Sequence, residues 1–212
     1  MLLEAQSFKT LQIIFLVIAP LIILGIIFII IYIPIKKRLV KNKFREYYYR
    51  KIYDIAKNQD YFLINNFAFR IDNGKTALID HILFGEKYIY LILDYYYEGD
   101  ITGTVNDTSL IYIPTRGKKC YTDNPLLRNK RLLSRFSLIT DLEQSMLIGI
   151  VLVNDECHIG VESHDKQYYF IQRQKLPKLI AAIESRNIDK INQVELEKAV
   201  KAIDKLNRKK RR

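Results

Sequence analysis

Glycine and proline are scarce in this 212-residue chain, with 8 and 5 copies. Disordered and collagen-like chains are rich in these residues, whereas 49% of this chain is hydrophobic and 27% is charged. The composition therefore predicts a packed core. At this length we expect one domain of ordinary size with an appendage, and two unrelated catalytic domains are excluded.

Cysteine is also scarce, and its two copies, Cys120 and Cys157, lie far apart in the sequence. No disulfide is inferred from them. The chain also lacks a P-loop, a G-x-S-x-G motif and an H-E-x-x-H motif. These absences exclude the common nucleotide-binding, esterase and zinc-protease interpretations.

Charge is missing from residues 11–35, where Tyr32 is the only ionisable side chain. As a helix this run would be about 37 Å long, more than the roughly 30 Å hydrocarbon core of a bilayer. A cleaved signal peptide would have a basic start, a shorter apolar stretch and a small-residue cleavage site. The run has none of these features, so we expect a retained transmembrane helix.

The basic excess of the chain, +11 overall, belongs to two flanking segments. The segment from Lys36 to Lys51 carries +7, the tail 205–212 carries +6, and residues 52–204 carry −2. Only Lys9 precedes the apolar run, and the basic residues directly after it are Lys36, Lys37, Arg38, Lys41, Lys43 and Arg45. The positive-inside rule then predicts an external N-terminus and a cytoplasmic domain. The segment from Lys36 to Lys51 would contact the lipid bilayer at its anionic headgroups.

The apolar pattern after this segment predicts a helix followed by three strands. Helical spacing relates Tyr48, Ile52, Ile55 and Ala56 within residues 44–58. Runs rich in β-branched and aromatic residues predict strands at 61–69, 76–84 and 87–97, separated by Asp72-Asn73-Gly74 and Gly85-Glu86. A short further strand is expected at 110–113.

The second half of the chain predicts a helix and then a buried strand. Asn124 and Pro125 are typical of an N-cap and a first helical position. Residues 146–153 form a continuous apolar run, which is typical of a strand covered on both faces. An edge strand at 168–172 and helices at 176–185 and 194–206 complete the expected elements.

This order of elements resembles the nuclease-related domain (NERD) family, a branch of the PD-(D/E)xK nuclease-like superfamily. The resemblance covers about residues 45–185 and rests on five segments: Ile79-Asp80-His81-Ile82, the strand 88–95, Gly99-Asp100-Ile101-Thr102-Gly103, Tyr121-Thr122-Asp123-Asn124-Pro125 and the strand 146–153. It implies an α/β fold, with an N-terminal transmembrane helix followed by a restriction-endonuclease-like αβββαβ domain and C-terminal helices.

In that family a strand Asp is followed by a Glu and a Lys two residues apart on the next strand. Residues i and i+2 of a strand share a face, so the carboxylates can hold a Mg²⁺ that activates water beside the Lys charge. By this resemblance Asp80 is the retained catalytic and metal-binding acid. Counting back from Gly99, Leu93 occupies the place of the Glu and Tyr95 that of the Lys. We therefore expect a degenerate centre without a cofactor, or with Mg²⁺ if activity survives.

An active nuclease with a rearranged acidic site remains the alternative. Asp94 would have to join Asp80, with Glu98 or Asp100 in support. A shift of one residue places Asp94 on the opposite strand face, unless a bulge re-aims it. Tyr95 cannot replace the lysine charge, because a phenol with an ordinary pKa of about 10 is neutral at cytoplasmic pH.

Basic residues also cluster between positions 116 and 135, where Asp123 is the only acid. The cluster consists of Arg116, Lys118, Lys119, Arg128, Lys130, Arg131 and Arg135. Contacts with phosphates would give salt-sensitive nucleic-acid binding without sequence preference. A solvated helix face or a second contact with the bilayer is the other interpretation.

Together these features predict a membrane-anchored, catalytically degenerate nuclease-related domain that binds nucleic acid or a protein partner. A third possibility is a membrane-docked module that binds a protein through its C-terminal helix. No oligomeric state is inferred. The expected segments are an extracytoplasmic N-terminus at 1–10, a transmembrane helix at 11–35, a basic linker at 36–44, the NERD-like domain at 45–185 and a C-terminal helix with a basic tail at 186–212.

Overall fold

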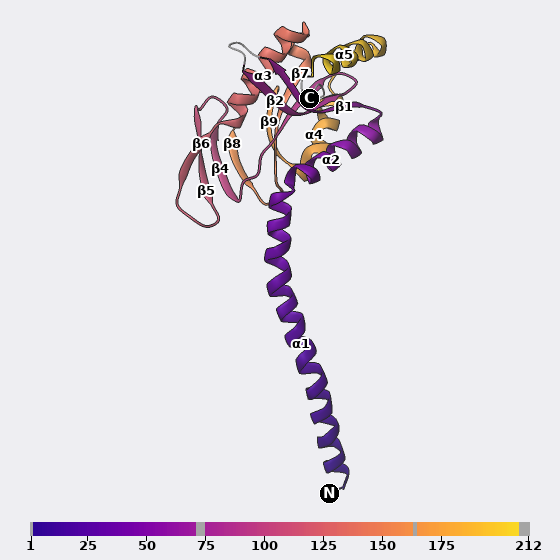
Figure 1. Ribbon diagram of the computed structural model, residues 1–212, viewed down its shortest axis with the longest axis vertical. Coiled ribbons are helices and arrows are strands. Elements are labelled where there is room, and N and C mark those ends of the chain that lie inside the picture. The colour runs from indigo at the N-terminus through magenta and orange to yellow at the C-terminus, as the bar shows by residue number, and fades with distance from the viewer. Residues whose placement is uncertain (1, 71–74, 163–164, 208–212) are drawn as a thin grey trace. The chain divides into compact units, whose positions relative to one another are not determined.

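The computed structural model divides the chain into two compact units, Met1–Lys43 and Phe44–Arg212 (Figure 1). The structure describes residues 2–70, 75–162 and 165–207. The predicted turn Asp72-Asn73-Gly74 and the end of the predicted basic tail, residues 208–212, lie outside the described residues.

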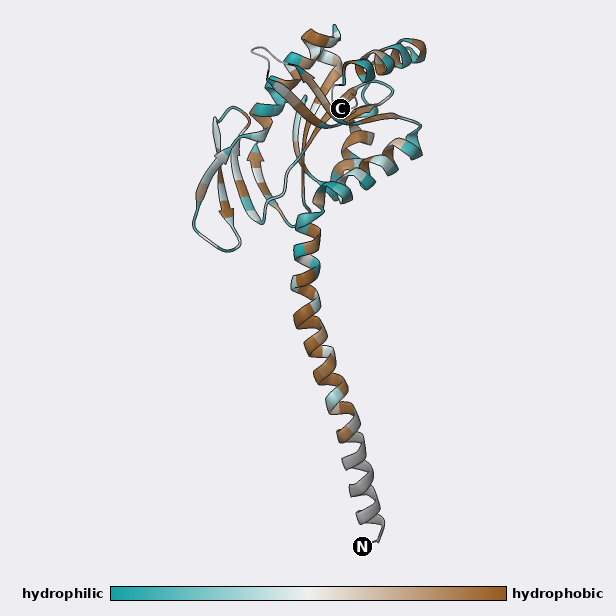
Figure 2. Cartoon of the chain, in the orientation of Figure 1, coloured by the Kyte–Doolittle hydropathy of each residue, from teal (hydrophilic) through white to brown (hydrophobic). Residues whose placement is uncertain are grey.

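The first unit consists of one long helix, α1 (Leu2–Asn42). Its part Ile18–Asn42 has a mean hydropathy of 2.9 and is long and apolar enough to cross a membrane. The large apolar side chains described between Leu16 and Ile35 are 46–77% exposed, and Figure 2 colours most of this part of the helix as hydrophobic. Exposed apolar surface of this extent needs lipid or a partner to cover it.

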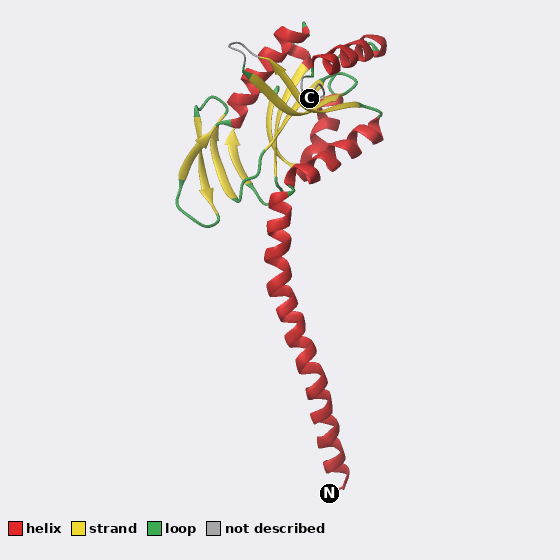
Figure 3. Cartoon of the chain, in the orientation of Figure 1, coloured by secondary structure: helices red, strands yellow, loops and turns green. Residues whose placement is uncertain are grey.

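The second unit is a mixed α/β domain, as predicted, and contains two sheets (Figure 3). The larger sheet has the strand order β1-β2-β3-β7-β9. Its strands are β1 (Phe62–Arg70), β2 (Thr76–Phe84), β3 (Ile89–Asp94), β7 (Leu147–Val153) and β9 (Tyr168–Gln172). The first three strands are antiparallel, whereas β3, β7 and β9 run parallel, so β9 is the predicted edge strand.

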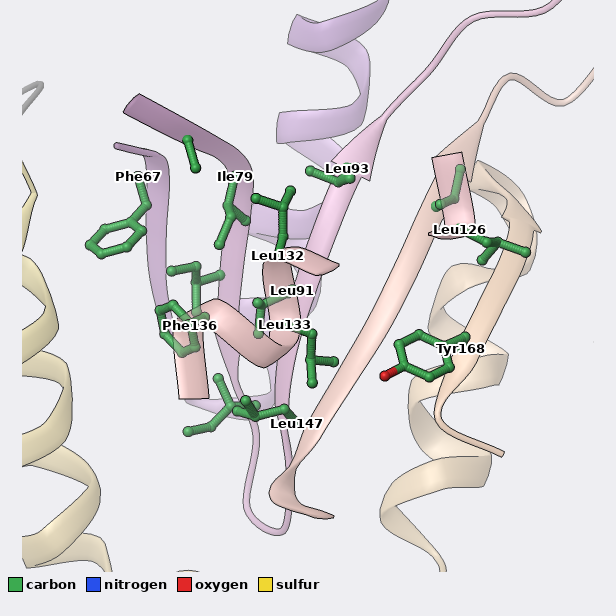
Figure 4. Close-up of a cluster of buried hydrophobic side chains, with 14 of the residues drawn as sticks. Phe67, Ile79, Leu91, Leu93, Leu126, Leu132, Leu133, Phe136, Leu147 and Tyr168 are labelled. Atoms are coloured by element: carbon green, nitrogen blue, oxygen red, sulfur yellow. The ribbon is translucent and has the colours of Figure 1, made fainter. Parts of the chain in front are cut away.

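Helices cover both faces of this sheet and make a three-layered body. They are α2 (Phe44–Gln59), α3 (Pro125–Thr140), α4 (Leu176–Glu184) and α5 (Gln193–Leu206), with short 3-10 turns at Gln144–Met146 and Arg173–Lys175. One core joins β3 to α3 and α5 through Leu91, Leu93, Leu126, Leu133, Phe136, Leu196 and Ile203; Figure 4 shows the part around α3. The other core joins β3 to α2 and α4 through Tyr90, Ile92, Tyr48, Ile52, Leu176 and Ile180. Each such buried side chain stabilises the fold by roughly 1.5–3 kcal/mol.

The smaller sheet was largely missed by the sequence analysis, which expected one short strand at 110–113. It has the order β6-β5-β4-β8, from β4 (Gly99–Thr104), β5 (Ser109–Pro114), β6 (Cys120–Asp123) and β8 (His158–Glu162). These strands bury few side chains, and β6 and β8 have no fully buried residue. Their hydrophobic alternation is therefore too weak to predict them.

Strand β3 is shorter than predicted, because it ends at Asp94 rather than at position 97. Residues 95–97 leave the larger sheet and lead the chain into β4. Tyr95 therefore lies just beyond the strand that was expected to carry it.

The regular alternation of faces is interrupted in both β1 and β2. In a regular strand Ile79 and Ile82 would point to opposite faces of the sheet, but in β2 both pack into the same core. The alternation of faces is therefore interrupted between Asp80 and His81. The adjacent strand β1 has the same interruption at Asn66, where φ is +54°. Pairing of β2 with β3 stops at His81 opposite Ile92, so Asp80 lies where the two strands separate. The irregularity lies in β1 and β2, whereas residues 89–94 of β3 pair continuously with β7.

Candidate functional site

A cleft of about 290 Å³ opens where β2 separates from β3. Asp80, Leu93 and Tyr95 line it together, although Asp80 lies on a different strand from Leu93. Arg45 from α2 and Arg128 from α3 also line the cleft. The structure thus brings the three positions of the family motif to one place, as the resemblance requires.

Asp80 is half-buried and has a structural role as well as a place in the cleft. Its Oδ2 accepts a hydrogen bond of 3.0 Å from the backbone N–H of Asp94. Because strand pairing has already stopped at this point, the side chain supplies the acceptor that a strand backbone would otherwise provide.

Asp94 directs its carboxylate to a histidine. Its Oδ2 lies 2.9 Å from Nε2 of His81, and the two side chains are only 1% and 6% exposed. Nδ1 of His81 lies 2.6 Å from Oδ1 of Asn65 and donates to this amide oxygen. Desolvation raises the pKa of Asp94, and the bond to His81 opposes this rise. Oδ1 of Asp94 has no hydrogen-bond partner among the described residues.

The donor set does not fit the Mg²⁺ site that the resemblance implies. Leu93 has no ligand atom and Tyr95 carries a phenol in place of a carboxylate, while Glu98 and Asp100 do not line the cleft. Asp80 and Asp94 are the carboxylates that remain, and His81 occupies one oxygen of Asp94. Over the described residues, no group of three or more His, Cys, Asp or Glu side chains could hold a metal ion. Mg²⁺ prefers an octahedron of oxygens, most often with carboxylates free to face it.

Positive charge reaches the cleft from two arginines. Nη1 of Arg128 donates a hydrogen bond of 3.1 Å to the Tyr95 hydroxyl, so a guanidinium lies beside this phenol. Arg45 lies over the Phe44 ring, with 5.7 Å between its guanidinium carbon and the ring centroid. Arg45 belongs to the basic segment predicted to face lipid. Its place in the cleft was not predicted, because no local pattern reports a contact with strands so distant in the chain.

Asn124 fixes the helix that carries Arg128. Its Oδ1 accepts hydrogen bonds from the N–H groups of Leu126 and Leu127, which confirms the predicted N-cap. Its Nδ2 also donates to three backbone oxygens of the β4–β5 connection, those of Thr104, Val105 and Asp107. One buried amide therefore connects the start of α3 to the smaller sheet. It fixes the position of the first turn of α3, where Arg128 lies.

The seven-residue basic cluster does not form one site. Arg128, Arg131 and Arg135 are exposed at helical spacing along α3, and we call them the α3 basic stripe. Lys130 instead lies over the Tyr168 ring at 5.5 Å. The three remaining members are exposed on the β5–β6 connection: Arg116, Lys118 and Lys119. Of the seven, only Arg128 lines the cleft.

Comparison with known proteins identifies the family of this chain. Residues 41–154 match the model of the NERD family, the nuclease-related domain. No curated protein and no solved structure matches the chain. The match ends just after β7, so β8, β9, α4 and α5 lie beyond it. Because the match covers more than half of the sequence, the chain belongs to the NERD family of nuclease-related domains.

Proposed function

We propose that this chain is a membrane-anchored NERD protein that has lost nuclease catalysis and binds nucleic acid through the α3 basic stripe. The observation that supports this most directly is the lining of the Asp80 cleft, where Leu93 and Tyr95 stand in place of an acid and a lysine. Metal-dependent hydrolysis of a phosphodiester needs carboxylates that hold the ion and a group that stabilises charge.

The charge of the cleft favours an anion over a divalent cation. Arg45 and Arg128 contribute two positive charges, and Asp80 contributes one negative charge. Arg45, Arg128 and Asp80 together therefore contribute a net charge of +1.

The α3 basic stripe supports nucleic-acid binding because its three guanidinium groups face solvent on one side of a rigid helix. Arginine contacts phosphate oxygens through paired N–H groups. Such contacts release counterions from the nucleic acid, so binding is salt-sensitive and shows little sequence preference.

Membrane anchoring rests on α1, which holds the candidate span Ile18–Asn42. Basic residues cluster at the C-terminal end of this helix and only Lys9 precedes its apolar part. Both features favour an external N-terminus with the second unit in the cytoplasm, close to anionic headgroups.

Loss of catalysis is tested with the full chain in phosphatidylcholine nanodiscs, incubated with DNA and RNA in Mg²⁺ or Mn²⁺. We expect both polymers to remain intact. Cleavage that disappears in Asp80→Ala but persists in Lys57→Ala would contradict the proposal and favour the active nuclease. Cleavage that persists in both variants comes from a contaminant.

One observation favours the active nuclease as a second candidate: the buried Oδ1 of Asp94 has no partner among the described residues, and Asp94 lines the same cleft as Asp80. The interaction module with a protein partner at the C-terminal helix has less support. Leu196 and Ile203 of α5 are buried in the core, and Oδ1 of Asn207 accepts a hydrogen bond from the Ala68 N–H of β1. Part of the apolar face of that helix is therefore already covered.

A further inference from the structure

Two guanidinium groups border the cleft from helices that are far apart in the sequence. Arg45 lies in the first turn of α2, and Arg128 lies in the first turn of α3. Both residues are exposed and line the cleft. A phosphate monoester carries about −1.5 to −2 charges and three free oxygens, whereas an internal phosphodiester carries about −1 and two free oxygens. Two guanidinium groups therefore match the monoester better.

Aromatic side chains form another part of the same wall. Phe44, Tyr95 and Tyr96 all line the cleft. The Tyr95 ring lies parallel to the buried Tyr97 ring, with 5.9 Å between centroids and 2° between planes. Tyr97 supports one ring face, so the half-buried Tyr95 offers its remaining surface to the cleft. Aromatic rings held in this way stack on nucleic-acid bases without regard to sequence.

The size of the cleft limits what can enter. Its volume of about 290 Å³ lies at the lower end of small-ligand pockets. This space suits one nucleotide and not a double helix. The α3 basic stripe begins at the cleft with Arg128 and continues along the helix to Arg135, about 10 Å further on. A strand whose last nucleotide occupies the cleft can place its next phosphates along this stripe.

We propose that the cleft binds a nucleoside with a terminal phosphate monoester, the phosphate between Arg45 and Arg128 and the base against Tyr95 and Tyr96. The ligand is the phosphorylated end of a nucleic-acid strand or a free mononucleotide. The strand-end form rests on the proposed nucleic-acid function, whereas the free-nucleotide form does not. In this arrangement the two guanidinium groups, and not a metal ion, supply the positive charge that faces the phosphate.

The test uses the full chain in phosphatidylcholine nanodiscs and fluorescence anisotropy of a labelled single-stranded 20-mer. The strand carries a phosphate at its 5′ end, at its 3′ end or at neither end. A second arm measures binding of AMP and adenosine by calorimetry. We expect a terminal phosphate to tighten strand binding about tenfold, and AMP to bind at least about tenfold tighter than adenosine.

Two variants and one control separate the cleft from the rest of the surface. Arg45→Gln and Arg128→Gln should each abolish the preference for a terminal phosphate. Arg45→Gln should still bind the unphosphorylated strand through the α3 basic stripe, which shows that it is folded. Lys57→Gln removes one exposed charge from the same helix as Arg45, outside the cleft, and should keep the preference.

The outcomes distinguish the two proposals. Equal binding of all three strands, with no preference for AMP, overturns the cleft site and leaves the nucleic-acid function standing. Binding of AMP that depends on Arg45, without binding of any strand, supports the cleft site with a free nucleotide and overturns the nucleic-acid function. Absence of binding in both arms overturns both proposals.

Discussion

Asp94 lines the cleft, but one oxygen of its carboxyl group is hydrogen-bonded to the buried His81. The bond to His81 and the second bond from His81 to Asn65 hold this group between β1, β2 and β3. Its neighbour Asp80 accepts the Asp94 N–H, so each acid also joins two strands. The two acids of the cleft therefore contribute to the fold, whether or not any catalysis survives.

The buried carboxyl makes stability depend on pH. Desolvation raises the pKa of Asp94 above its ordinary value of 3.8. The native state then binds the Asp94 proton more tightly than the unfolded state, so stability is full below pH 3.8 and falls as the pH rises through the native pKa. We expect Asp94→Asn to gain stability relative to the wild type between pH 4 and 7, by about 1.4 kcal/mol per unit of pKa shift.

Urea unfolding of the full chain in detergent at several pH values measures this difference. Asp189→Asn changes an exposed carboxylate and controls for the loss of one charge. A difference between wild type and Asp94→Asn that stays constant with pH, or that changes in the opposite sense, would contradict the role of burial.

At the scale of elements, α3 combines a packed face with a charged one. Leu132, Leu133 and Phe136 enter the core, and the α3 basic stripe faces solvent. The helix is held at its start by Asn124, so the stripe has a fixed position relative to the cleft. A rigid, exposed row of guanidinium groups is what phosphate contacts require.

Reversal of this row should weaken nucleic-acid binding. We expect the triple variant Arg128→Glu, Arg131→Glu and Arg135→Glu to lose affinity and to reduce the slope of log K against log salt by about 2–3, because each phosphate contact contributes about 0.7–0.9. Anisotropy titrations at several salt concentrations measure both quantities. The matched control reverses three exposed lysines elsewhere, Lys57, Lys178 and Lys198, and should have a smaller effect. If the two triple variants lose the same affinity, the net charge of the protein and not the position of the α3 basic stripe determines nucleic-acid binding.

Local signals predicted the elements of the larger sheet, whereas contacts over long distances in the sequence escaped prediction. The apolar run of β7 and the Asn-Pro start of α3 are local features, and both elements were found where expected. The smaller sheet was mostly missed because β4 contains two glycines and only Ile101 is fully buried in it. Arg45 joins the cleft through packing of α2 beside β2 and β3, and no spacing rule reports such a contact. The pairing of Asp94 with His81 depends on the interruption at Asp80, which has no sequence signature.

For the molecule as a whole, the proposed orientation has a direct test in its two cysteines. Cys120 is exposed and Cys157 is buried in the second unit. Burial raises the pKa of the Cys157 thiol to about 12, so this thiol reacts slowly at neutral pH. Cys120 therefore reports which side of the membrane the second unit occupies.

We expect a membrane-impermeant maleimide to label the chain only after cells are permeabilised, since the second unit is proposed to be cytoplasmic. The Cys120→Ser variant should remain unlabelled in both conditions and shows that the signal comes from Cys120. Labelling of Cys120 on intact cells would refute the proposed orientation. A second measurement separates the membrane and soluble fractions of the same cells. A chain that begins at Phe44 should be found in the soluble fraction if α1 is the anchor.

Leu93 would make the proposed loss of catalysis difficult to reverse. Its side chain is 1% exposed and packs with Leu91 and Leu133 while it also borders the cleft. The substitution Leu93→Glu would place an ionised carboxylate in the apolar core before any lysine or metal ion was present to compensate for its charge. Under this proposal each intermediate on the way back to an active nuclease would be less stable and still inactive, so selection would favour keeping the site for binding.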